Sequence, residues 1–561
     1  MSMEKLRSAA TSSAVLLAVA IVTAACGSNA VSPGDSEEPG APSESSGGEP
    51  GSGGTLSVGT ESDIFSLDPS QGYDVISWPA ERLMFETLLG YDEGTELVPQ
   101  LAEEMPEVSD DGLTYTFTLR DDVSFINGDG SVHREMTAED VAYSINRILN
   151  PNLTPTPSPV AGAFFWIIEG GQEVIDGEAD EATGIEVVDE RTISFTLVQP
   201  DPTFLNVLAM PFGSVVPADL ADDDTAAFSE APVGTGPYYL ESWTVGEQAV
   251  FVRHESYWGT PAPTDRVEFR FGIDGNTAAQ QVEANQLDIM ADPVPSGVVN
   301  SLRESYPDRI ITVGQVAVSY LAMDTSPPDG GPLGVLEVRQ AMNHAIDKEN
   351  ILQLLRGRGE VAHCIYPTLL PGHDPDCMPY DHDPERAREL LEEAGFGDGF
   401  STTLYTDTAE DSTAIAQAIQ QDLAEIGIEV EIITQDFDTL LGTISTPHEA
   451  PLVYIGWFQD FPDPSDFYDP ILSCAAAVEG GANSSWWCDE EVDAFAAEAK
   501  VEADPERRLE MYQDLQERVM GQAPWVPLVY PAQDTFISER VVGFKAHPVW
   551  FIDLAKYAVS D

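Results

Sequence analysis

The sequence predicts an α/β protein built from two lobes with a cleft between them. The chain has 561 residues, 42% of them hydrophobic, which is enough apolar material for about two to four domains. Helix patterns alternate with strand patterns through its second half, as in parallel sheets with crossover helices. From Trp525 to the end, the pattern returns to strand and loop. A chain that passes between two α/β lobes explains all three observations.

Strand and helix patterns can be placed through the first half. The folded body begins at Gly54, with a strand in GTLSVG. TYTFTLR at residues 114–120 and TISFTLV at residues 192–198 alternate apolar and polar side chains, which is typical of half-buried strands. Between them, TAEDVAYSINRIL predicts a helix, with Thr137 as N-cap and Asp140 three residues later.

The second half carries stronger helix signals. An Asp-Pro pair begins a helix at Asp383, and Gly395 ends it. Residues 413–426 place isoleucine and leucine on one stripe, and the strand IEVEII follows at residues 428–433. A second Asp-Pro pair begins a helix at Asp504.

The composition is strongly acidic. With 25 Lys and Arg against 97 Asp and Glu, the formal net charge is −72. Such a surface repels phosphate, so we expect no nucleic-acid partner. Adaptation to high salt and a preference for cationic ligands both explain the acidity. We favour adaptation, because the acids are spread along the whole chain.

The N-terminus predicts export. Lys5 and Arg7 precede an apolar run at residues 14–22, which is too short to span a bilayer as a helix. The tetrad TAAC resembles a bacterial lipobox, so we interpret residues 1–26 as a lipoprotein signal peptide that ends at the lipidated Cys26. An ordinary cleaved signal peptide is the alternative. Residues 27–53, rich in Gly, Ser and Pro, predict a disordered tether.

Four further cysteines fit an exported protein. They allow three connectivities. We predict the sequence-local pairs Cys364–Cys377 and Cys474–Cys488, because each closes a short loop.

The stretch IGWFQDFPDPSDFYDP, residues 455–470, combines rings with aspartates at every third position. A metal loop, a catalytic carboxylate pair, a turn and a ligand pocket are the alternatives. The spacing is not that of a D-x-D-x-D-G calcium loop, and residues 362–383 hold His and Cys without a compact metal pattern. No G-x-S-x-G, H-E-x-x-H or G-x-x-x-x-G-K-[ST] motif occurs. We therefore expect neither an enzyme nor a metal or other cofactor.

The order of several segments resembles the extracellular solute-binding proteins of peptide and nickel ABC importers, solute-binding protein family 5. Where relatives often read K-F-H-D-G, this chain has a longer loop at residues 124–136. The segments that carry the resemblance are FETLLGYD (85–92), LVPQLAEEMPEVSDDGLTYTFTLRDDVSF (97–125), TAEDVAYSINRI (137–148), VGTGPYYLESW (233–243), VRQAMNHAIDKENIL (338–352), DPERARELLEEAGF (383–396) and GWFQDFPDP (456–464).

The resemblance implies a periplasmic-binding-protein-like fold with two lobes, hinge strands between them and a subdomain inserted in the first lobe. The expected parts are lobe I at 54–90, 210–318 and 525–561, the inserted subdomain at 91–209, and lobe II at 319–524.

The resemblance also implies a ligand site. In peptide-binding relatives, an aspartate at the position of Asp460 holds the α-amino group of the ligand. A buried ammonium requires such a carboxylate partner. A ligand carboxylate would require an Arg or Lys; Arg356 and Arg358 are among the candidates, and the sequence does not decide which residue it is. The expected ligand-binding residues are Asp460, Trp457, Phe458, Tyr73, Trp78 and Trp166.

The resemblance implies an extracellular substrate-binding component of an ABC importer that captures short peptides and delivers them to permease subunits. We expect a monomer anchored by Cys26 to the outer face of the cell membrane. An oligosaccharide or a nickel chelate is the alternative ligand. Binding of a peptide would depend most on Asp460, and binding of a sugar would depend most on Trp457 or Trp78.

Overall fold

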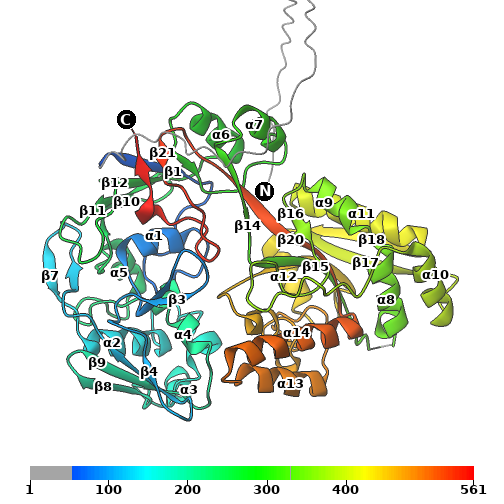
Figure 1. The fold of residues 1–561 in the computed structure, drawn as a ribbon, viewed down its shortest axis with the longest axis horizontal. Coiled ribbons are helices and arrows are strands. Elements are labelled where there is room, and N and C mark those ends of the chain that lie inside the picture. The colour runs from blue at the N-terminus through cyan, green and yellow to red at the C-terminus, as the bar shows by residue number, and fades with distance from the viewer. Residues whose placement is uncertain (1–52, 329, 561) are drawn as a thin grey trace, which may run out of the picture. The chain divides into compact units, whose positions relative to one another are not determined.

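The computed structural model describes residues 53–328 and 330–560, and two α/β lobes account for most of them (Figure 1). The predicted signal peptide, Cys26 and the tether lie outside the described residues. No described helix is long and apolar enough to cross a membrane.

One lobe is built on a five-stranded mixed sheet. Strand β1 (Thr55–Gly59) pairs in parallel with both of its neighbours, and its Val58 lies in register with Phe269 and Ile289. The apolar side chains of these strands form a buried core with helix α1. In order across the sheet, the strands are β10 (Tyr238–Thr244), β11 (Gln248–Arg253), β12 (Arg266–Arg270), β1 (Thr55–Gly59) and β13 (Ile289–Met290).

The second lobe is built on a seven-stranded sheet. Strand β20 pairs with three others and extends toward the C-terminal segment (Figure 1). Strands β17 and β18 are parallel and joined by helix α11, which confirms the predicted crossover. In order, the strands are β14 (Ile310–Gly314), β20 (Trp525–Phe536), β15 (Ala317–Met323), β19 (Leu452–Phe458), β17 (Phe400–Asp407) and β18 (Ile428–Gln435), with β16 (Gly359–Val361) beside β20.

This second sheet has a hydrophobic core on each face. Alternate residues of one strand belong to different cores: Tyr320 to one and Leu321 to the other. Helices α8–α11 cover the Leu321 side, and α12–α14 cover the Tyr320 side. The apolar runs of these strands are explained by burial on both faces.

Residues 89–196 add small sheets. The two alternating segments predicted as strands pair antiparallel, with Phe117 opposite Ile193. The strands are β2 (Leu89–Tyr91) with β3 (Leu97–Pro99), β6 (Ser124–Ile126) with β7 (Val132–Glu135), and the four-stranded sheet β4 (Glu107–Val108), β5 (Thr114–Thr118), β9 (Thr192–Thr196) and β8 (Ile185–Asp189); near the C-terminus β21 (Val541–Val542) pairs with β22 (Ala558–Val559).

Side chains cap the helices as the sequence predicts. Thr137 and Asp140 form a capping box, and Asp383 and Asp504 each accept two backbone N–H bonds at their helix starts. The helices are α1 (Ser77–Met84), α2 (Ala138–Leu149), α3 (Gly171–Ile175), α4 (Phe204–Val207), α5 (Thr225–Glu230), α6 (Gly275–Glu283), α7 (Val299–Ser305), α8 (Leu336–Ala345), α9 (Lys348–Leu354), α10 (Pro384–Glu393), α11 (Glu410–Glu425), α12 (Phe437–Ile444), α13 (Glu490–Lys500) and α14 (Pro505–Gln522); short helical turns are η1 (Ala161–Phe165), η2 (Pro211–Gly213), η3 (Pro332–Gly334), η4 (Pro464–Phe467), η5 (Cys474–Ala476) and η6 (Leu554–Lys556).

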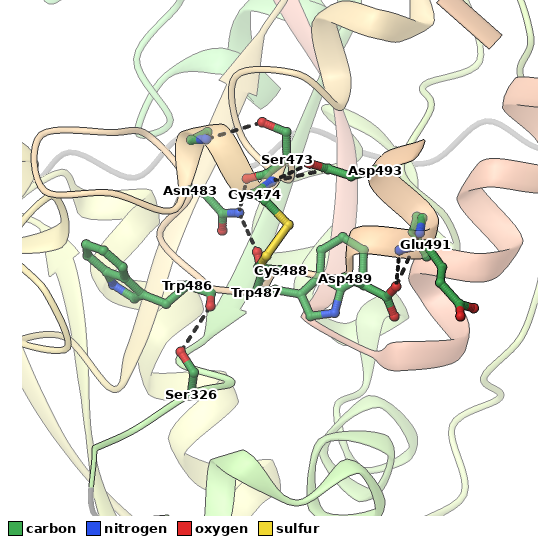
Figure 2. The surroundings of a disulfide bond; sticks show 12 residues. Ser326, Ser473, Cys474, Asn483, Trp486, Trp487, Cys488, Asp489, Glu491 and Asp493 are labelled. Carbon is green, nitrogen blue, oxygen red and sulfur yellow. Dashed lines mark hydrogen bonds between the residues drawn. A yellow bond between two sulfur atoms is a disulfide. The ribbon is translucent and has the colours of Figure 1, made fainter. Parts of the chain in front are cut away.

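Both predicted disulfides are confirmed. Cys364 bonds Cys377, and Cys474 bonds Cys488. Figure 2 shows the second bond beside Asp493, whose carboxylate accepts a hydrogen bond from the Cys474 N–H at 3.2 Å. The bond closes the loop that leads into α13.

We expect the double substitution Cys474→Ser/Cys488→Ser to lower the free energy of unfolding by about 3 kcal/mol, because it frees a loop of this size in the unfolded chain. Urea denaturation would measure the loss, with the oxidised wild-type chain as control. Iodoacetamide labelling of these thiols in the native, unreduced protein would contradict the bond itself.

Candidate functional site

Each of the four aspartates in IGWFQDFPDPSDFYDP has its own surroundings, so they do not form one ligand set. Asp463 is the structural anchor. Its carboxylate accepts two hydrogen bonds from Arg508 of α14, at 2.7 and 2.8 Å, and one from the Ser465 N–H at 2.9 Å. Burial raises the pKa of Asp463, but the Arg508 charge and these hydrogen bonds outweigh burial and hold it below the ordinary value.

Asp469 takes part in a bridge between two regions that lie far apart in the sequence. Lys500 of α13 lies 2.9 Å from Asp469 and 3.3 Å from Asp201, which follows β9. Burial lowers the pKa of Lys500, but the two carboxylates outweigh it and raise the pKa above its ordinary value. Lys500 is therefore charged and ties the two regions together.

Asp460 lies just beyond the end of β19. The Tyr73 hydroxyl, from the loop before α1, donates a hydrogen bond to Asp460 Oδ1. Burial raises the pKa of Asp460 to about 6, against the opposing effect of the hydrogen bonds from Tyr73 and Asp466. Asp460 is thus mostly ionised at neutral pH and is partnered by neutral groups.

Asp466 contacts Asp460 directly. Its Oδ2 accepts hydrogen bonds from the Asp460 N–H at 2.9 Å and from Trp457 Nε1 at 3.3 Å. The residue is only 3% exposed. Burial, followed by the charge of Asp460, raises the pKa of Asp466 well above its ordinary value. Burial therefore favours the protonated form of this carboxyl group.

Cavities open on both sides of Asp460. One, of about 670 Å³, extends toward η1, α13 and Lys500. Another, of about 150 Å³, extends toward α1 and adjoins a third, of about 400 Å³, which reaches Arg358. The residues that line both of the latter two are Val75, Pro79, Phe458, Trp550 and Phe551.

The structure brings all six predicted ligand-binding residues to the two cavities at Asp460. The larger cavity is lined by Tyr73, Trp166, Trp457 and Asp460, and the smaller one by Tyr73, Trp78, Phe458 and Asp460, among others. Their contact with a ligand stays a prediction.

Trp457 and Phe458 are adjacent residues at the end of β19. Period-two alternation does send them to opposite sides, but each side has a cavity. Trp457 lines the larger cavity while also packing against the lobe II core. The Phe458 ring lies 5.5 Å from that of Phe551.

Sequence reasoning missed several residues at the site. Asp466, Lys500 and Trp550 line the cavities, yet the sequence singles out none of them. Of the two candidate arginines, Arg358 lines the 400 Å³ cavity, where its guanidinium donates to Asp411. In the described part of the chain, no group of three or more His, Cys, Asp or Glu side chains is arranged to hold a metal.

Comparison with known proteins decides the family. The profile of the bacterial extracellular solute-binding proteins, family 5 (Middle), matches residues 96–478. The chain belongs to this family. Members of family 5 are extracytoplasmic transport binding proteins.

Relatives in this family bind different ligands. Di/tripeptide-binding protein 4 of Pseudomonas aeruginosa is 32% identical over 85% of this chain and 91% of its own. Heme-binding protein A of Haemophilus influenzae is 29% identical over 86% and 87%. The periplasmic binding protein DppA of Helicobacter pylori, solved with the peptide STSA, superposes with a TM-score of 0.75 at 28% identity, over 91% of this chain and 99% of that one.

We expect Arg508→Met to lower the free energy of unfolding by about 3–5 kcal/mol, because it leaves the Asp463 carboxylate buried without its cation. The double variant Asp463→Asn/Arg508→Met should recover much of that loss, since it buries no charge. Chemical denaturation of the three proteins measures both effects. A double variant as unstable as Arg508→Met would contradict this account.

Proposed function

We propose that this protein captures short peptides between its lobes and delivers them to the permease of an ABC importer. The observation that carries the proposal is the ionised Asp460, held among neutral partners and aromatic rings where two cavities meet. The peptide-binding relatives support it.

The α-ammonium of the peptide would pair with Asp460. In a cavity with little water, a charge-assisted hydrogen bond to a carboxylate is far stronger than at the exposed surface. The neighbouring rings, Tyr73, Trp78 and Trp457, would exclude water from the pair and contact the ligand's apolar atoms. At the far end of the adjoining cavities, Arg358 would receive the ligand carboxylate.

Capture would proceed by closure of the lobes. Tyr73 comes from lobe I and Asp460 from lobe II, so their hydrogen bond exists only when the lobes approach. Ser296 and Asp411 make a second contact between the lobes, at 3.0 Å. A ligand that contacts both lobes shifts the population toward the closed form. Anchoring to the outer face of the membrane through Cys26 completes the proposal.

We expect Asp460→Asn to weaken binding of trialanine or dialanine by about 30-fold or more, because the buried ammonium loses its anionic partner. Isothermal titration calorimetry measures the loss. Glu498→Gln, which removes an exposed acid from α13, is the matched control and should bind as the wild type does. N-acetylation of the peptide should weaken binding to a similar extent.

The competing ligand classes give different outcomes. If Trp457→Ala or Trp78→Ala abolishes binding while Asp460→Asn has little effect, the ligand is a sugar and the peptide proposal is wrong. Mass spectrometry of molecules released from the purified protein by denaturation would identify a peptide, an oligosaccharide, a nickel chelate or a haem directly.

Peptide affinity should also depend on pH. The pKa of Asp460 is about 6 without ligand, and a neighbouring ammonium lowers it. Affinity should therefore be nearly constant from pH 6 to 7.5 and should fall by about tenfold per unit at lower pH, as the proton on Asp460 must first be displaced. Calorimetry between pH 4.5 and 7.5 tests this; an affinity that rises on acidification would refute it.

A further inference from the structure

The Asp460 and Asp466 carboxyl groups lie close together, since Asp466 Oδ2 accepts a hydrogen bond from the Asp460 N–H at 2.9 Å and each group affects the pKa of the other. An ionised carboxylate is only an acceptor, so a hydrogen bond between two carboxyl groups requires a proton on one of them. Asp466 Oδ2 also accepts from the Asp460 N–H and from Trp457 Nε1, which fixes the relative position of the two groups. Two carboxylates this close, one of them buried, repel each other when both are ionised, so this arrangement favours one proton on the pair.

The surroundings favour Asp466 as the proton's holder. Asp466 is almost fully buried and lines only the larger cavity, whereas Asp460 is more exposed and lines both. Asp460 also accepts the Tyr73 hydroxyl hydrogen bond, which stabilises its negative charge. Two phenols, Tyr73 and Tyr91, lie within electrostatic range of Asp466, and both are neutral because burial raises the pKa of each.

The other charged groups near Asp460 and Asp466 are bonded to other residues. Asp463 is the second carboxylate that acts on Asp466, and Arg508 is bonded to it. Lys500 is shared by Asp469 and Asp201. Among the described residues, no cation is bonded to Asp466, so protonation is what removes its charge.

We propose that Asp466 is a positioning residue that keeps a proton, donates a hydrogen bond through it to the Asp460 carboxylate, and so leaves Asp460 as the single anion presented to the ligand. This inference rests on the proposed function for the role of Asp460. It assigns Asp466 two tasks: its Oδ2 fixes the backbone of Asp460, and its hydroxyl orients the Asp460 carboxylate. An ionised Asp466 would repel Asp460 and disrupt the site.

Asparagine provides a matched variant. Its amide has the shape of a protonated carboxyl, with one oxygen that accepts and a nitrogen that donates, and it carries no charge. Asp466→Asn should keep both tasks at every pH. Asp466→Ala should lose both, because it leaves the Asp460 N–H and Trp457 Nε1 without their acceptor.

The first test needs no ligand. An acid whose pKa is raised in the folded state stabilises the fold most below its unfolded pKa and loses that contribution as pH rises through the folded value. The melting temperature of Asp466→Asn should therefore increase relative to wild type as pH rises from 6 to 9. A difference that stays constant with pH, or that moves the other way, overturns the proposal.

The second test uses trialanine at pH 7. Asp466→Asn should bind within about threefold of wild type, while Asp466→Ala should bind about tenfold or more weakly, since two buried donors lose their partner. Equal losses in both variants would mean that a negative charge at Asp466 is required, which overturns the proposal. If wild type binds no peptide, the proposed function fails, and the melting experiment still decides whether Asp466 holds a proton.

Discussion

The buried ion pair between Asp463 and Arg508 fixes the segment on which the site depends. Asp463 lies between Asp460 and Asp466, and Arg508 lies within the long helix α14, so the pair attaches a proline-containing turn to a rigid element. Such pairs contribute little net stability compared with apolar residues, but they define one arrangement because any other leaves a charge buried and unpaired. The direction of Asp460 into the cavities follows from this anchor.

The neighbouring carboxylates of the turn at residues 460–469 have different roles, because different groups contact them. Asp463 faces a guanidinium that lowers its pKa, Asp469 pairs with an ammonium, and Asp466, to which no cation among the described residues is bonded, has its pKa raised by burial. Asp460 remains the acid with only neutral partners at a cavity. The chemical role of each aspartate in this turn therefore depends on the groups that contact its carboxyl, and not on the period-three spacing.

Much of the fold could be predicted from local patterns: helix caps at Thr137, Asp383 and Asp504, the crossover from α11 to β18, and both disulfides. These features depend on residues close in sequence. The contact of Lys500 with Asp201 and that of Trp550 with Tyr91 could not be predicted, because each joins residues hundreds of positions apart. Asp466 resembles its three neighbours until its burial is known. Alternation along β19 places Trp457 and Phe458 on opposite sides of the strand, but it does not say what occupies each side.

The net charge of −72 suggests a preference for cationic ligands, but it explains little about which ligand is bound. Exposed carboxylates are screened by water and salt over about 10 Å, so an acid-rich surface attracts cations weakly and without selectivity. Asp460 is largely removed from solvent, and its interaction with an ammonium is correspondingly stronger. Recognition of a peptide amino group would thus depend on one desolvated charge and on the neutrality of Asp466 beside it. The many other acids are free to serve solubility at high salt without altering that selectivity.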